Sequence, residues 1–150
     1  MIDHDEYRDD YIAGILAQTK TIALVGASPS PHRDSHEVML SLQRAGYRVI
    51  PVNPNGGETI LGEKVYGSLA EVPAPFELVD VFRKSEDAGL VVDEAIALAG
   101  NKGIRAVWMQ LGVRDDAAAA RAEAAGLEVV MDRCTKVEHA RVGGGRRAAS

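Results

Sequence analysis

The stretch that constrains the fold most is residues 21–37, in which an apolar segment leads through a short loop into an amphipathic segment. Residues 21–25 are apolar or β-branched without alternation, which is typical of a strand buried on both faces of a sheet. Asp34 and Glu37 then have the spacing of a helix capping box. The stretch therefore predicts a strand–loop–helix unit of the kind that binds phosphate at a helix N-terminus.

The rest of the chain repeats this alternation of apolar segments and helical patterns. Further strands are expected at residues 47–52, 78–82, 104–109 and 127–131, with two short strands and one helical turn between residues 58 and 72. Alternating strands and helices imply a parallel sheet with right-handed crossovers. The predicted fold class is α/β, a Rossmann-like doubly wound three-layer sandwich with a mainly parallel five-stranded sheet.

Four helices are expected, one before the first strand and three between strands, each with a start or stop signal. Ser, Asp and Asn favour helix starts, and glycine favours the position just after a helix. The signals are Asp3 for a helix over residues 3–18, Asp34 and Gly46 for the second, Ser85 and Gly100 for the third, and Asp115 and Gly126 for an alanine-rich fourth.

Length and charge narrow the class of protein. The 150 residues fit one domain, expected over residues 1–142, with residues 143–150 as a flexible tail. A net charge of −5 and an aromatic content of 5% argue against a nucleic-acid-binding surface. The single cysteine excludes an internal disulfide, and there is neither an apolar run long enough for a membrane span nor a secretion leader. A cytoplasmic protein without membrane contact is expected.

The loops that follow the strands should form the binding site, because ligands of open parallel sheets bind beyond the carboxyl ends of the strands. The first loop departs from the glycine-rich dinucleotide fingerprint, since Ser28 and Pro31 occupy its second and third glycine positions. Its backbone N–H groups still suit a phosphate. The second strand ends in Asn53-Pro54, where an NAD site usually has a carboxylate for the ribose. With Arg33, Arg83 and Lys84 nearby, this pattern favours NADP or coenzyme A (CoA) over NAD.

The strand-end motifs resemble those of the small bacterial and archaeal CoA-binding proteins, whose fold is shared with the CoA-binding domain of the succinyl-CoA synthetase alpha subunit. The matching segments lie between residues 20 and 140: VGAS at 25–28, GYRVIPVNP at 46–54, GEKVY at 62–66, DVFR at 80–83, VWMQLG at 107–112, and MDRC at 131–134 with Glu138-His139.

The resemblance implies a position for each part of CoA. The pyrophosphate would lie on the turn of Gly26, Ala27 and Ser28, with Arg33 nearby, and a bulky residue in place of Gly26 should abolish binding while leaving the fold intact. The other ligand-binding residues implied are Val52, Asn53 and Pro54 with Phe82 and Arg83 for the adenosine, and Gln110, Leu111 and Gly112 for the pantetheine arm.

Three classes of function remain open, of which the third is a purely structural or interaction protein that binds no ligand. The first is a non-catalytic module that binds CoA or acyl-CoA as a carrier, a sensor or one part of an assembly, because the phosphohistidine domain of the synthetase has no counterpart in 150 residues. The second is an enzyme, either an NADP-dependent reductase or an acyl-transfer subunit that uses Cys134 near the pantetheine tip. An inert, buried Cys134 and a structural His139 are the simpler expectations.

Metal ligands and partners complete the predictions. The histidines show no spacing with cysteine or acidic residues that would indicate a metal site. The first helix or residues 56–75 offer surfaces for a homodimer or for another protein partner.

Overall fold

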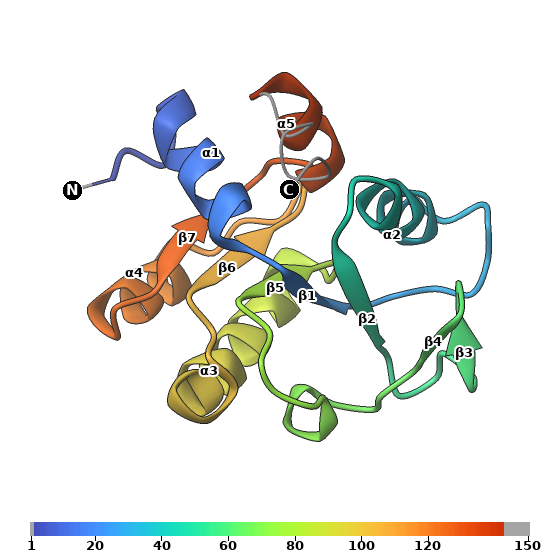
Figure 1. Cartoon of the computed structure of the whole chain (residues 1–150). Helices are drawn as coiled ribbons and strands as arrows, with labels where there is room; N and C mark the ends of the chain where they lie inside the picture. Colours follow the sequence, from blue (N-terminus) through green and yellow to red (C-terminus); the bar gives the residue numbers. More distant parts are fainter. Residues whose placement is uncertain (1, 143–150) are drawn as a thin grey trace.

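The computed structural model describes residues 2–142, which form a three-layer α/β fold around one twisted sheet (Figure 1). The sheet has the strand order β2-β1-β5-β6-β7, and every neighbouring pair is parallel. Its strands are β1 (Thr21–Val25), β2 (Arg48–Val52), β5 (Leu78–Val81), β6 (Ala106–Met109) and β7 (Glu128–Val130). From β1 the chain winds first to β2 on one side and then to β5 on the other, which confirms the doubly wound, Rossmann-like fold class.

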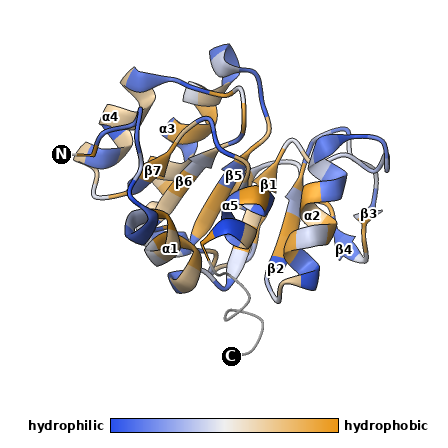
Figure 2. Ribbon diagram, turned by 90° about the horizontal axis from the view of Figure 1, so that it is seen from above, coloured by the Kyte–Doolittle hydropathy of each residue, from blue (hydrophilic) through white to orange (hydrophobic). Residues whose placement is uncertain are grey.

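Helices cover both faces of the sheet. They are α1 (Asp9–Gln18), α2 (Asp34–Arg44), α3 (Ser85–Lys102), α4 (Asp116–Ala124) and α5 (Thr135–Arg141). Residues of α3 and α4 share a buried apolar cluster with one face, and residues of α1 and α2 share a second cluster with the other. Along β1, Ala23 and Val25 belong to the first cluster and Ile22 and Leu24 to the second, which is why this strand is apolar without interruption. Figure 2 shows the apolar strands between helices with polar outer faces.

A small extension follows β2. The strands β3 (Thr59–Ile60) and β4 (Glu63–Lys64) form an antiparallel pair, and a 3₁₀ turn, η1, spans Leu69–Glu71. Both elements lie where the sequence predicts two short strands and a helical turn.

Several helix ends differ from the predictions. The first helix begins at Asp9 rather than Asp3, whose carboxylate instead accepts a hydrogen bond from the N–H of Asp5 at 2.9 Å. The capping box is wrong, because Asp34 is already helical and no side chain caps α2. The third helix passes Gly100 and ends before Gly103, whose φ of 77° reverses the chain.

Other boundaries agree with the signals, and one helix was missed. The Asp115 carboxylate caps α4 by accepting from the N–H of Ala118 at 3.0 Å, and Gly46 and Gly126 follow their helices with φ of 105° and 91°. The sequence did not predict α5, whose buried residues are Thr135, Glu138 and His139 rather than an apolar stripe.

Two tyrosine hydroxyls form hydrogen bonds with backbone groups at the outer edge of β7. The Tyr11 hydroxyl donates to the Val129 carbonyl oxygen at 2.8 Å and accepts from the Val129 N–H at 2.9 Å. The Tyr7 hydroxyl accepts from the N–H of Met131 at 2.8 Å. Burial raises the pKa of Tyr7 to about 12 and also raises that of Tyr11, so both remain neutral and keep their protons. The N-terminal segment thus satisfies edge groups that a further strand would otherwise pair.

Replacing Tyr11 by phenylalanine should expose this edge. Tyr11→Phe removes the hydroxyl that pairs with both the N–H and the carbonyl oxygen of Val129. We expect it to lower the free energy of unfolding by about 1 to 3 kcal/mol and to promote association through β7. Tyr66→Phe is the control, since the Tyr66 hydroxyl has no side-chain hydrogen bond within residues 2–142. Urea unfolding and sedimentation measure the two effects, and equal behaviour of the two variants would contradict the role of Tyr11.

Membrane insertion finds no support in the helices. Within residues 2–142, none of them combines the length and the hydrophobicity that a bilayer crossing requires. The predicted flexible tail, residues 143–150, lies outside the described residues.

Candidate functional site

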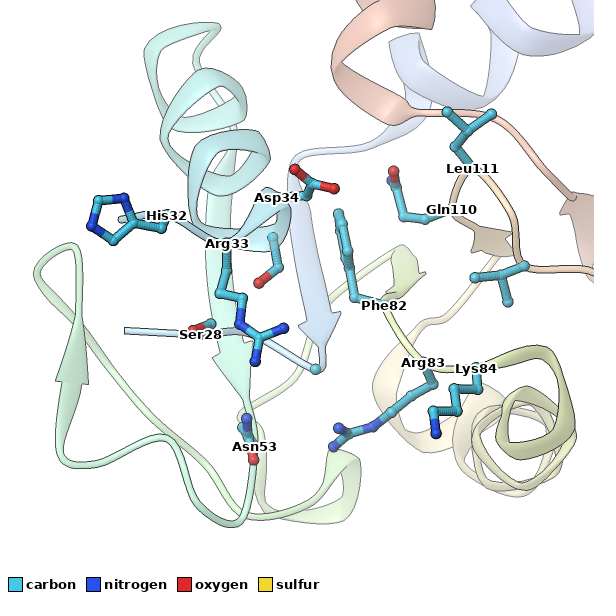
Figure 3. Close-up of a pocket in the computed structure, with 13 residues that line it drawn as sticks. Ser28, His32, Arg33, Asp34, Asn53, Phe82, Arg83, Lys84, Gln110 and Leu111 are labelled. Carbon is cyan, nitrogen blue, oxygen red and sulfur yellow. The ribbon is translucent and has the colours of Figure 1, made fainter. Parts of the chain in front are cut away.

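A cleft of about 710 Å³ opens beyond the carboxyl ends of β1, β5 and β6, at the point where the strand order reverses (Figure 3). It lies between the first turn of α2 and the loop that leads into α3. Its lining residues are Gly26, Ser28, His32, Arg33, Asp34, Ser35, Asn53, Phe82, Arg83, Lys84, Gln110, Leu111 and Val113. The cleft therefore occupies the place where open parallel sheets bind their ligands.

The floor of the cleft is formed by a close approach of two backbones at Gly26. The Gly26 N–H donates to the Val52 carbonyl oxygen at 2.8 Å, and its φ is 94°. A Cβ atom at this position would lie 2.0 Å from the carbonyl oxygen of Phe82. Only glycine fits where the chain leaves β1 beside the end of β5.

The loop after Gly26 is held by short polar contacts. The Asn53 side chain donates to the Ala27 carbonyl oxygen at 2.8 Å and accepts from the N–H of Asn55 at 2.9 Å. The Ser28 hydroxyl accepts from the N–H of Ser30 at 3.1 Å. Asn53 thus ties the loop to the end of β2 and has no carboxylate to offer a ribose.

Three residues that line this cleft have backbone N–H groups without protein partners. In the part of the chain that the structure describes, the N–H groups of Ser28, Asp34 and Ser35 donate to no other residue. Those of Asp34 and Ser35 belong to the first turn of α2, where a helix leaves its N–H groups unpaired and carries partial positive charge. Together they form an arrangement suited to an anion.

Positive side chains without counter-ions gather at the same place. Arg33, Arg83 and Lys84 make no ion pair or side-chain hydrogen bond with any residue from 2 to 142. Within residues 2–142 most of the other arginines form ion pairs, for example Arg114 with Asp5 at 2.7 Å and Arg141 with Asp9 at 2.6 Å. In Figure 3, Arg33 and Arg83 extend toward the same space from α2 and from the end of β5. The cleft also contains one carboxylate, that of Asp34.

A buried polar network lies beneath the wall of the cleft. Gln110 Nε2 donates to Asp80 Oδ1 at 2.7 Å and to Thr135 Oγ1 at 2.8 Å, and Thr135 Oγ1 donates to Asp80 Oδ2 at 3.0 Å. Asp80 is completely buried, and burial raises its pKa from 3.8 to about 7 against the opposing effect of these two donors. The network joins β5, the end of β6 and the start of α5.

Eight of the predicted site residues line the cleft, and five lie outside its lining. The eight are Gly26, Ser28, Arg33, Asn53, Phe82, Arg83, Gln110 and Leu111. Of these five, Ala27 and Val52 are buried, and Pro54 and Gly112 are exposed. Cys134 is half-buried and packs against the second apolar cluster.

Five lining residues were absent from the predicted set. They are His32, Asp34, Ser35, Lys84 and Val113. Asp34 and Ser35 take part through the start of α2, which residue type alone does not reveal. Lys84 directly follows Arg83, and its place beside a strand end was the one available signal.

Metal ligands are not clustered in this structure. Within the described residues, three or more His, Cys, Asp or Glu side chains do not come together in an arrangement that could hold a metal ion.

Comparison with known proteins gives close matches over most of the chain. The chain is 40% identical over 129 residues to the uncharacterized protein YneT of Bacillus subtilis (strain 168), covering 86% of this chain and 92% of YneT. A solved structure of a hypothetical protein from Pyrococcus horikoshii OT3 has a TM-score of 0.84 and 41% identity, covering 95% of this chain and 96% of that one.

A larger enzyme subunit matches over part of its length. The alpha subunit of the ADP-forming acetate–CoA ligase I of Pyrococcus furiosus is 30% identical over 97 residues, which are 61% of this chain and 20% of that subunit. Residues 20–140 match the family described as CoA binding domain. By this match over most of its length, the chain belongs to the CoA-binding domain family.

Proposed function

We propose that this protein binds CoA or acyl-CoA in the cleft and acts as a binding module without catalysis of its own, as a carrier, a sensor or one part of an assembly. The observation that carries the proposal is the convergence of three unpaired cations and three unpaired backbone N–H groups on one cleft of a CoA-binding-domain fold. CoA has a pyrophosphate and a ribose phosphate, which need such donors.

The choice of CoA over NAD rests on Asn53. Its side-chain amide forms hydrogen bonds with the backbone of Ala27 and Asn55. The end of β2 therefore carries this amide in place of the carboxylate that an NAD site usually has. A ribose phosphate would meet no repulsion from this position, and Arg33 and Arg83 supply charge for it. Calorimetry with CoA, dephospho-CoA, NAD and NADP tests the proposal. We expect CoA to bind most tightly and dephospho-CoA more weakly, and a CoA affinity no higher than that for NAD would overturn it.

Removing one cleft arginine should weaken binding markedly. A hydrogen bond to a charged group contributes about 1.5 to 3 kcal/mol, so Arg83→Gln or Arg33→Gln should lower CoA affinity roughly 10-fold or more. Arg105→Gln is the control, because the exposed Arg105 side chain makes no ion pair or hydrogen bond with residues 2–142 and follows α3 at the opposite end of the sheet. Calorimetry at two salt concentrations measures the effect. Equal losses for Arg105→Gln and Arg83→Gln would mean that only the overall charge matters.

The acyl-transfer alternative is disfavoured by the position of Cys134. Its side chain packs against the second apolar cluster and does not line the cleft. We expect Cys134 to remain unmodified after incubation with acetyl-CoA and with CoA disulfide, as measured by mass spectrometry of the intact protein. A stoichiometric adduct on Cys134 would restore thiol chemistry to the function.

A further inference from the structure

We propose that Asp80 and Thr135 are positioning residues that fix the orientation of the Gln110 side-chain amide, so that the cleft presents the Gln110 carbonyl oxygen to an N–H or O–H donor of the ligand. The network itself is a property of the protein. The nature of the donor rests on the proposed function, in which it is a secondary amide N–H of the pantetheine arm of CoA.

The number of protons in the network determines how the amide is oriented. The single hydroxyl proton of Thr135 is given to Asp80 Oδ2, so Thr135 Oγ1 can only accept from Gln110. Above about pH 7, where Asp80 is ionised, its carboxylate can only accept as well. Both neighbours therefore require the NH₂ end of Gln110, and the distances of 2.7 and 2.8 Å show that both of its protons are used. A flipped amide would put its carbonyl oxygen against two acceptors with no proton between them.

The other end of the amide faces the cleft. Gln110 is only 4% exposed and yet lines the cleft. Its Oε1 atom has no hydrogen-bond partner within residues 2–142, and it is not among the buried side-chain atoms that are cut off from solvent. It is therefore an unused acceptor at the cleft surface. A ligand that covered this oxygen without donating to it should bind roughly 10-fold more weakly than one that donates.

The surroundings of this acceptor indicate the kind of group that it would bind. In Figure 3, Gln110 lies between Phe82 and Leu111, away from Arg83 and Lys84. Asp34, a second acceptor, is close by in the same view. A largely apolar ligand segment that carries N–H groups fits this end of the cleft, whereas a phosphate fits the other.

The first test observes the fixed orientation of the Gln110 amide without any ligand. At a pH of about 8, where Asp80 is ionised, proton–nitrogen NMR of the Gln110 side chain should show two resolved NH₂ signals that are slow to exchange with solvent in the wild type. Thr135→Val removes one acceptor and should speed this exchange at least 10-fold, and Thr135→Ser, which keeps the hydroxyl, should restore slow exchange. Fast exchange in the wild type would overturn the proposal.

The second test measures the consequence for binding. Gln110→Met removes the acceptor and should weaken CoA binding about 10-fold. Thr135→Val does not alter a cleft-lining residue and should weaken CoA binding about 3-fold or more. Thr135→Ser should restore the wild-type affinity. A CoA analogue with an ester oxygen in place of the pantetheine amide N–H should bind the wild type about 10-fold more weakly than CoA does. The analogue and CoA should bind Gln110→Met with equal affinity.

The outcomes separate this proposal from the proposed function. If the wild type binds no CoA, the proposed function fails, and the NMR comparison still decides whether Asp80 and Thr135 fix the Gln110 amide. If CoA binds the wild type but binds Gln110→Met and Thr135→Val equally tightly, the positioning role is overturned and the proposed function stands. Thermal unfolding of each variant, including Thr135→Ser, shows whether a loss of affinity reflects a loss of fold.

Discussion

Gly26→Ala is expected to lower the free energy of unfolding by about 3 to 5 kcal/mol, because it combines backbone strain with a direct overlap. The φ of 94° is unfavourable for any residue with a Cβ atom, and this Cβ would lie 2.0 Å from the Phe82 carbonyl oxygen and 2.9 Å from its carbonyl carbon. These are backbone atoms at the end of a central strand, so they cannot turn away as a side chain could. Urea unfolding measures the effect directly.

Gly126→Ala is the matched control for this substitution. Its φ of 91° is nearly the same, but an added Cβ there meets nothing within 4 Å. We expect a loss of about 1 to 2 kcal/mol from backbone strain alone. If the two variants were equally stable, the close approach at Gly26 would not be the cause. The overlap contradicts the expectation that a bulky residue at position 26 leaves the fold intact, because the backbone atoms of Phe82 would have to move. The loss of binding stays a prediction.

Asp80 should make the protein less stable as the pH rises from about 4 to 7. Burial raises the pKa of Asp80 from 3.8 to about 7, so the folded state keeps a proton that the unfolded state releases in this range. The contribution is fully present below pH 3.8 and is lost as the pH rises through about 7. The difference between these pKa values corresponds to roughly 4 kcal/mol.

The Asp80→Asn variant isolates this contribution. An asparagine does not titrate, so the difference in unfolding free energy between wild type and variant should shift in favour of the variant as the pH rises from 4 to 7. Urea unfolding at a series of pH values provides the curves. Asp87→Asn, at an exposed site in α3, should run parallel to the wild type. A wild-type curve parallel to that of Asp80→Asn would show that Asp80 ionises as easily in the folded state as in the unfolded one.

The sequence predicts the sheet well because its strands are buried on both faces. Residues such as Ile22 and Val25 on β1 are apolar whichever face they meet, so the strand pattern needs no knowledge of the neighbours. The helix α5 is different. Its inward side chains include Thr135, which bonds to Asp80, and Glu138, which bonds to Arg141, so polar contacts rather than hydrophobic periodicity determine its burial.

The candidate site was predicted where single residues carry the chemistry and missed where the backbone or distant pairs do. Gly26 and Arg83 stand directly at strand ends, which is a local signal. The donors of Asp34 and Ser35 are backbone groups of a helix start. Asp80 looks in the sequence like one polar residue in a strand, because its partners are 30 and 55 positions further along the chain.

The two covered edges of the sheet limit how this chain can assemble. At one edge of the sheet, the Tyr7 and Tyr11 hydroxyls occupy the free side of β7. At the other edge, Tyr66 lies beside the end of β2, where its N–H donates to the Pro51 carbonyl oxygen at 3.0 Å and its carbonyl oxygen accepts from the N–H of Asn53 at 2.8 Å. A partner strand would find no continuous row of backbone groups on either side. Any dimer of this protein therefore has to form through helix or loop surfaces, and two sheets cannot merge into one without first displacing a segment of the chain's own fold.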